Sequence, residues 1–172
     1  MIRILGIDPG SINTGYGIID NEGNHSQHID NGIIKIQGDD LATKLRCIFS
    51  GLNELIQQFQ PDEISIERVF MHRNADSALK LGQARGAAIT ECTMQDLPIY
   101  AYTTNQVKQA TVGKGHAAKQ QVQHMIKVLL CLSEVPATDA ADALAIALCH
   151  AHSREGVLRM QGIKGIRRGR LQ

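Results

Sequence analysis

A nearly uninterrupted apolar run at the start of the chain limits what it can fold into. Residues 2–7 read Ile-Arg-Ile-Leu-Gly-Ile, and an acid, Asp8, follows before the turn residues Pro9 and Gly10. A short run that is apolar at almost every position is typical of a strand covered on both faces. The sequence therefore predicts a central strand over residues 2–8, with helices on both sides of its sheet.

The remaining pattern predicts four more strands and four helices. Apolar residues at 4-3-4-3-4 spacing from Leu41 to Phe59 indicate an amphipathic helix, and Asn21-Glu22-Gly23-Asn24 is a hairpin signal. The strands are expected over 14–20, 27–36, 63–69 and 98–102, and the other helices over 76–94, 117–130 and 139–152. This order predicts an α/β fold with a mixed five-stranded sheet, three antiparallel strands followed by parallel ones, flanked by helices.

The size and composition suit one domain. A chain of 172 residues can bury a full core, and we expect a domain over residues 1–153 followed by a basic, flexible tail over 154–172. The chain contains no run of 18 apolar residues and no secretory leader, so the sequence indicates neither a membrane-spanning helix nor secretion. The four cysteines lie far apart without C-x-x-C spacing, which predicts reduced thiols, no structural zinc and a cytoplasmic location.

Four acids stand where the pattern otherwise predicts burial. Asp8 and Glu67 each end an apolar run, and Asp139 and Asp142 lie three apart at the start of the last predicted helix. Buried carboxylates are costly unless a positive group satisfies them, and Mg²⁺ is held by a few carboxylates plus water and phosphate oxygens. Because strand ends meet at one sheet edge, the acids predict a metal-dependent phosphoryl-transfer site.

Each acid also has a simpler interpretation. Asp8 can be a turn residue, Glu67 a surface charge on an edge strand, and the other two can favour a helix N-terminus through its dipole. Asp139 and Asp142, however, share a predicted helix face with Ile146 and Cys149, which indicates that they point inward. One shared site explains all four acids together.

The charges are unevenly distributed. Residues 68–127 carry eight basic and three acidic side chains, and residues 154–172 carry six basic and one acidic. Two basic segments that bracket acid-bearing segments suit the binding of a polyanion that must also approach carboxylates. An ordinary solvated surface explains the charges of the middle segment equally well.

Several motifs, in this order and spacing, resemble the RuvC family of Holliday junction resolvases. The resemblance extends from residue 2 to about residue 152, and five motifs in register are far more specific than any one of them. They are Ile7-Asp8-Pro9-Gly10-Ser11 with Thr14-Gly15-Tyr16-Gly17, Ile66-Glu67-Arg68-Val69-Phe70, Asn74-Ala75-Asp76-Ser77-Ala78 with Leu81-Gly82-Gln83-Ala84-Arg85-Gly86, Gln106-Val107-Lys108, and Asp139-Ala140-Ala141-Asp142-Ala143-Leu144-Ala145.

The resemblance implies an RNase H-like fold, a homodimer and Mg²⁺-dependent paired nicking of four-way DNA junctions, with Mn²⁺ as a substitute. By position, the four acids match the family's catalytic acids, and some relatives carry His where this chain has Asp139. Two metal ions per site would clamp the attacking and leaving oxygens. The implied partners are junction DNA and a branch-migration complex of RuvA and RuvB proteins.

The resemblance also suggests residues that touch DNA. Lys119 matches a basic residue near the family's site, where it would hold the scissile phosphate or steady the attacking water. Phe70 would stack on an unpaired base at the junction centre, although a core role is the default for Phe. We expect further phosphate contacts from basic side chains, namely Arg68, Arg73, Lys80, Lys108 and Lys114.

Small residues on the helix from Asp76 would pack on the chain's own sheet or on a twofold-related copy; they are Ala75, Ala78, Gly82, Gly86 and Ala87.

Two other functional classes stay open. An actin-like or sugar-kinase ATPase also ends its first strand in Asp-x-Gly, but needs a second such domain. A junction-binding protein without catalysis would use the same scaffold.

Overall fold

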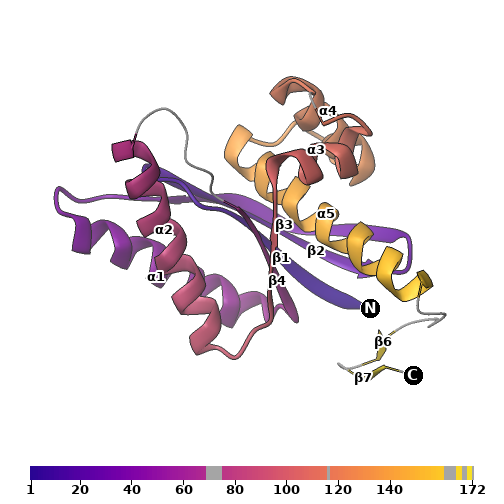
Figure 1. Cartoon of the computed structure of the whole chain (residues 1–172), viewed down its shortest axis with the longest axis horizontal. Coiled ribbons are helices and arrows are strands. Elements are labelled where there is room, and N and C mark those ends of the chain that lie inside the picture. The colour runs from indigo at the N-terminus through magenta and orange to yellow at the C-terminus, as the bar shows by residue number, and fades with distance from the viewer. Residues whose placement is uncertain (69–74, 116, 161–165, 168–169, 172) are drawn as a thin grey trace.

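The computed structural model describes residues 1–68, 75–115, 117–160, 166–167 and 170–171. Figure 1 shows a central sheet with helices on both of its faces. The elements are β1 (Ile2–Asp8), β2 (Asn13–Glu22), β3 (His25–Lys35), α1 (Leu41–Phe59), β4 (Glu63–Glu67), α2 (Ala75–Met94), β5 (Ile99–Tyr102), α3 (Thr104–Val112), α4 (Lys119–Leu129), α5 (Thr138–Met160), β6 (Ile166–Arg167) and β7 (Arg170–Leu171).

The main sheet has five strands in the order β3-β2-β1-β4-β5. Strands β1, β2 and β3 pair in antiparallel fashion, and β1, β4 and β5 pair in parallel. This arrangement confirms the predicted mixed sheet with β1 at its centre. Parallel pairing brings the carboxyl ends of β1 and β4 to the same edge of the sheet.

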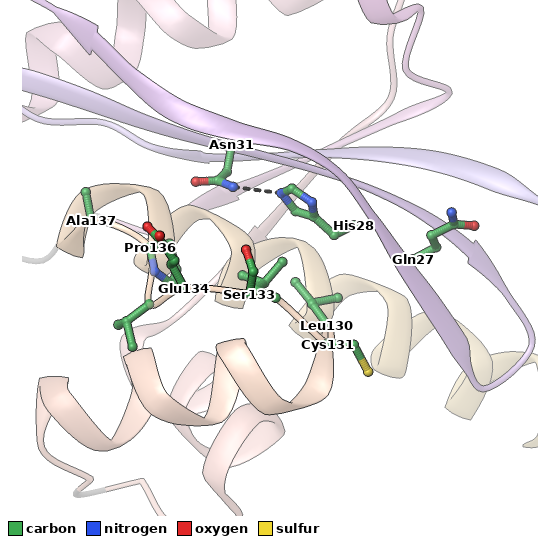
Figure 2. Close-up of a pocket in the computed structure, with 11 residues that line it drawn as sticks. Gln27, His28, Asn31, Leu130, Cys131, Ser133, Glu134, Pro136 and Ala137 are labelled. Atoms are coloured by element: carbon green, nitrogen blue, oxygen red, sulfur yellow. Dashed lines mark hydrogen bonds between the residues drawn. The ribbon is translucent and has the colours of Figure 1, made fainter.

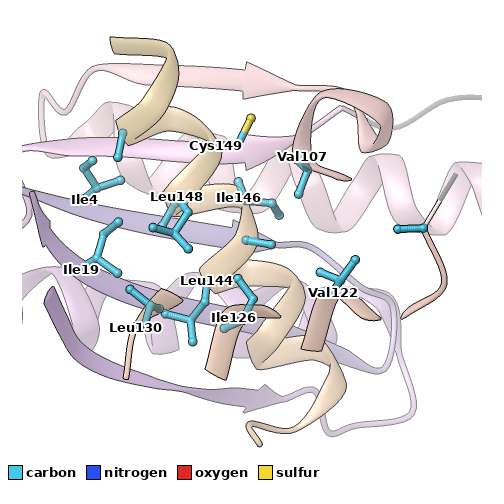
Figure 3. Close-up of a cluster of buried hydrophobic side chains, with 14 residues drawn as sticks. Ile4, Ile19, Val107, Val122, Ile126, Leu130, Leu144, Ile146, Leu148 and Cys149 are labelled. Atoms are coloured by element: carbon cyan, nitrogen blue, oxygen red, sulfur yellow. The ribbon is translucent and has the colours of Figure 1, made fainter. Parts of the chain in front are cut away.

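Alternate side chains of the central strands enter two cores. Leu5 and Ile7 of β1 pack with Ile64 and Ile66 of β4 against helices α1 and α2. On the other face, Ile4 belongs to a second core, to which α5, α3 and α4 contribute the other helical side chains (Figure 3). Because successive side chains of a strand point to opposite faces, Asp8 lies on the same face as Ile4, toward α5.

Helix α5 is buried on nearly all sides through its middle, since it lies between the sheet and the layer formed by α3 and α4. Close approach to the sheet depends on glycines. A Cβ on Gly6 would lie 2.2 Å from the Ala143 carbonyl oxygen, and a Cβ on Gly15 would lie 2.1 Å from the Asp139 carbonyl oxygen. The absence of these side chains lets the first turns of α5 rest directly on β1 and β2.

The structure differs from the predicted elements in three places. Helix α3 was not predicted; it begins after Thr103, whose hydroxyl accepts from the Gln106 N–H while the Gln106 side chain accepts from the Thr103 N–H. The predicted end of the last helix at residue 152 is wrong, because α5 continues to Met160; no proline interrupts this segment. Strand β4 ends at Glu67 rather than at residue 69.

Helix α5 crosses the predicted domain boundary at residue 153 without a break, so the start of the predicted basic tail is helical. The division of the chain at that residue stays a prediction. In the described part of the chain, no helix has the length and apolar character needed to cross a membrane.

Candidate active site

Two of the four predicted acids lie side by side at the edge of the sheet. The parallel register pairs Ile7 of β1 with Ile66 of β4, so the next residues, Asp8 and Glu67, end neighbouring strands at the same level. Strand alternation directs both away from the α1 and α2 core and toward α5. The sequence position of each acid is enough to explain this placement once β1 and β4 are paired.

Helix α5 brings the other two acids toward the same edge. Asp142 is half-buried and lines a cavity with Asp8 and Glu67. Asp139, one turn earlier, does not line that cavity; its Oδ2 accepts a hydrogen bond from Asn13 Nδ2 at 3.3 Å. The structure therefore gathers three of the acids around one cavity and holds the fourth beside it.

This cavity has a volume of about 290 Å³ and combines opposite charges on an apolar floor. The three acids face two lysines, and α3 and α4 supply most of the remaining wall. The lining residues are Asp8, Glu67, Thr104, Val107, Lys108, Lys119, Val122, Asp142 and Ile146.

Asp8 has the most perturbed acidity at the site. Burial first, and then the charges of Glu67, Asp142 and Asp139, raise the pKa of its carboxyl to about 8, while the charge of Lys119 opposes them. Strong desolvation together with a cluster of like charges is typical of functional sites. The carboxyl of Asp8 therefore needs a cation nearby to stay ionised near neutral pH.

Lys119 supplies part of that positive charge. Its Nζ lies 3.3 Å from Oδ2 of Asp142, and both residues line the cavity. The charge of Asp142 raises the pKa of Lys119, so the lysine stays protonated. Burial raises the pKa of Asp142, and the charge of Lys119 lowers it in turn. One lysine, however, cannot neutralise four carboxylates.

The donor set suits a hard divalent cation, because several carboxylates converge on one partly buried cavity with an excess of negative charge. As they stand, no three His, Cys, Asp or Glu side chains among the described residues form a group that could hold a metal ion. The carboxylates would have to move closer to share an ion, and their mutual repulsion opposes this until a cation arrives.

Three residues that contact the acids were not singled out from the sequence. Thr104 Oγ1 donates to Glu67 Oε1 at 2.6 Å, and Arg85 Nε donates to the Glu67 carbonyl oxygen at 2.9 Å. Asn13 contacts Asp139 as described above. The Thr-x-x-Gln capping signature at Thr103 would have predicted α3 and hence the position of Thr104.

The predicted DNA contacts fall in different places. Lys108 lines the acid cavity with Lys119. Lys80 lies elsewhere, paired with Asp76 at 2.7 Å, in a cavity between α1 and α2. Arg68 follows Glu67 and is exposed, and Lys114 is exposed in the connection between α3 and α4. Phe70, His72 and Arg73 lie outside the described residues.

A larger cavity of about 750 Å³ lies between β3 and the segment that joins α4 to α5 (Figure 2). Its wall includes His28 and Asn31, whose Nε2 and Nδ2 atoms are 2.7 Å apart, and Glu134 on the opposite side. None of the predicted site residues lines it. Size alone therefore does not mark the functional site in this molecule.

Comparison with known proteins decides the family. The model for the family described as "Crossover junction endodeoxyribonuclease RuvC" matches residues 4–150. The chain belongs to the RuvC family. The RuvC protein of Pseudoalteromonas atlantica is 53% identical over 173 residues, and that of Hahella chejuensis is 49% identical over 172 residues; both alignments cover 100% of each chain.

The fold agrees with this assignment. The structure of T. thermophilus RuvC in complex with a Holliday junction substrate is similar to this chain, with a TM-score of 0.83 and 35% identity over 91% of this chain and 97% of that one. The predicted RNase H-like α/β fold is thus confirmed. RuvC membership leaves the actin-like ATPase alternative without support.

Proposed function

We propose that this chain resolves four-way (Holliday) DNA junctions by paired, metal-dependent hydrolysis of phosphodiester bonds, in homologous recombination and DNA repair. One observation carries the proposal. In a chain of the RuvC family, Asp8, Glu67 and Asp142 meet around a single cavity that Lys108 and Lys119 also line. Acids that hold cations and lysines that attract phosphate are the groups that this reaction needs.

The four acids would hold the metal. Asp8, Glu67 and Asp142 face the cavity, and Asp139 lies near enough to raise the pKa of Asp8 by its charge. We propose Mg²⁺, replaceable by Mn²⁺, with two ions per site. When bound, divalent ions would make a water more acidic and offset the charge that develops on the phosphate. Asp8, whose pKa is about 8, would bind a cation only after losing its proton.

The two lysines would position the substrate. Lys119 is bonded to Asp142 but is mostly exposed, so its ammonium group can reach a phosphate that enters the cavity. Lys108 lines the same cavity and is half-buried. We propose that both neutralise the scissile phosphate and hold it against the acids. Arg68, Lys80 and Lys114 would contact flanking phosphates, together with Arg73, and Phe70 would stack on an unpaired base.

We also propose a homodimer, because a four-way junction offers two equivalent cleavage points that a twofold-symmetric enzyme can reach together. A Cβ added at Gly82 or Gly86 would meet nothing within 4 Å, so this side of α2 is open to a second copy.

RuvA and RuvB proteins are the proposed branch-migration partners. Because the proposed substrate is chromosomal DNA, we place the protein in the cytoplasm.

The test is cleavage of a synthetic four-way junction with and without Mg²⁺. Four variants, Asp8→Asn, Glu67→Gln, Asp139→Asn and Asp142→Asn, should each lose nicking and keep junction binding. Asp39→Asn and Glu134→Gln are matched controls, since both acids are exposed and line other cavities. Full nicking by a variant would remove that acid from the site.

The same assay distinguishes a junction-cleaving enzyme from the remaining alternative. A junction-binding protein without catalysis would bind the junction tightly and leave it intact at every Mg²⁺ and Mn²⁺ concentration. Robust nicking in excess chelator would instead contradict a metal mechanism.

A further inference from the structure

Helix α3 places a hydroxyl directly against one of the acids. Thr104 is the first residue of α3, and its Oγ1 donates to Oε1 of Glu67 at 2.6 Å. Both residues line the acid cavity. Since a hydroxyl has one proton to donate, this bond engages one oxygen of Glu67 and leaves the other for a different partner.

The backbone around Glu67 is fixed independently of this contact. Arg85 of α2 donates to the Glu67 carbonyl oxygen at 2.9 Å, and the Arg68 N–H donates to the Tyr102 carbonyl oxygen at 2.8 Å. These bonds set where the strand ends, but neither reaches the carboxylate. Among the described residues, Thr104 is the one that donates a hydrogen bond to the Glu67 side chain.

The donor itself is held firmly. The preceding residue, Thr103, caps α3 through its reciprocal hydrogen bonds with Gln106, and Val107 anchors the next turn in the core. The orientation of Thr104 is therefore determined by a capped helix rather than by a free loop. A carboxylate that would otherwise sample several rotamers is given one preferred direction.

We propose that Thr104 is a positioning residue for the reaction: its hydroxyl holds the Glu67 carboxylate in the rotamer that presents Oε2 to a divalent cation beside Asp8. The inference rests on the proposed function for the identity of the cation, but not for the contact itself. Partners that orient metal-binding side chains in this way typically change metal affinity or activity about ten- to a hundredfold when they are removed.

Thr104→Val removes the hydroxyl and keeps the shape, and Thr104→Ser keeps the hydroxyl. Thr111→Val is the matched control, because Thr111 lies on the same helix and, among the described residues, its hydroxyl bonds within that helix, to the Val107 carbonyl oxygen at 2.8 Å. The first measurement needs neither metal nor DNA: the three-bond couplings of the Glu67 side chain, by nuclear magnetic resonance. They should report one rotamer in wild type, Thr104→Ser and Thr111→Val, and averaging in Thr104→Val.

The second measurement is single-turnover junction cleavage over a range of Mg²⁺ concentrations. Thr104→Val should raise the Mg²⁺ concentration for half-maximal cleavage roughly tenfold, with unchanged junction binding, and Thr104→Ser should restore the wild-type value. Unaveraged couplings and a wild-type Mg²⁺ dependence in Thr104→Val would overturn the inference. Failure of the wild type to cleave would overturn the proposed function, whereas the couplings would still decide the positioning role.

Discussion

Gly6 of β1 faces the carbonyl oxygen of Ala143 in α5 so closely that a Cβ on Gly6 would lie 2.2 Å from that oxygen. The same Cβ would lie 2.9 Å from the backbone nitrogen of Ala147. Both neighbours are backbone atoms of a buried helix, so neither can turn away as a flexible side chain would. The distance between α5 and the sheet, and with it the position of Asp142 relative to Asp8, depends on this absent side chain.

Gly6→Ala should therefore push α5 away from the sheet. We expect a loss of about 1–3 kcal/mol of unfolding free energy, measured by urea denaturation, and a fall in cleavage larger than the fall in junction binding. Gly156→Ala, in α5, is the control, since a Cβ there meets nothing within 4 Å. It should leave stability unchanged or raise it, because Ala has a higher helix propensity than Gly.

Asp8→Asn should stabilise the metal-free protein at neutral and high pH. The folded-state pKa of Asp8 is about 8, above the ordinary value, so the folded state holds a proton that the unfolded chain releases near pH 4. The contribution of the Asp8 carboxyl to the free energy of unfolding is fully present below about pH 4 and is lost as the pH rises through about 8.

In chelator, the melting temperature of Asp8→Asn should exceed that of wild type at pH 9, and the difference should vanish near pH 4. Each 1 kcal/mol corresponds to about 2–4 °C for a chain of this size. Mg²⁺ should reduce the difference, because it stabilises the ionised wild type alone. A pH-independent difference would show that Asp8 is not buried among like charges.

Lys119→Met should impair cleavage more than binding. The substitution removes the charge 3.3 Å from Asp142 and leaves that acid and its neighbours without their nearest cation. We expect the rate of single-turnover cleavage to fall roughly a hundredfold, as for loss of one charge-stabilising donor. Lys127→Met, in the last turn of the same helix, is the control and should cleave like wild type. Equal loss in both variants would indicate a general effect of charge on DNA binding.

Glu63→Gln should destabilise the fold without touching the reaction. Glu63 lies at the opposite end of β4 from Glu67, where its oxygens are 2.6 Å from His150 Nε2 and 3.2 Å from Arg154 Nε. Burial raises the pKa of Glu63, but the hydrogen bond from His150 and the charge of Arg154 outweigh it and leave the pKa below its usual value.

The loss in Glu63→Gln should be about 2 kcal/mol at pH 7, as for a hydrogen bond to a charged group. Because the folded pKa is lowered, this stability is present above the ordinary pKa and disappears as the pH falls through the folded value, so the variant and wild type should converge below about pH 4. Urea denaturation of both proteins at several pH values measures this difference in the free energy of unfolding. A changed Mg²⁺ dependence of cleavage would contradict a purely structural role.

Much of the fold could be predicted from residue patterns. A nearly continuous apolar run identified the central strand, the spacing from Leu41 to Phe59 identified α1, and a hairpin signal joined β2 to β3, because these patterns reflect interactions between near neighbours. Helix α3 was missed, since its start is encoded by a four-residue capping box rather than by apolar spacing. The end of α5 was missed because the prediction ended the helix where the basic segment begins, and a change in charge does not by itself end a helix.

The sequence by itself determined which residues carry charge and that Asp8 and Glu67 each end an apolar run, and it therefore predicted that they would share a sheet edge. Only the tertiary structure decided that Asp142 lines the cavity while Asp139 stays beside it with Asn13, because this depends on how closely α5 rests on Gly6 and Gly15. The contact between Thr104 and Glu67 joins residues 37 positions apart. Packing of whole elements fixes such contacts, and local sequence does not contain that information.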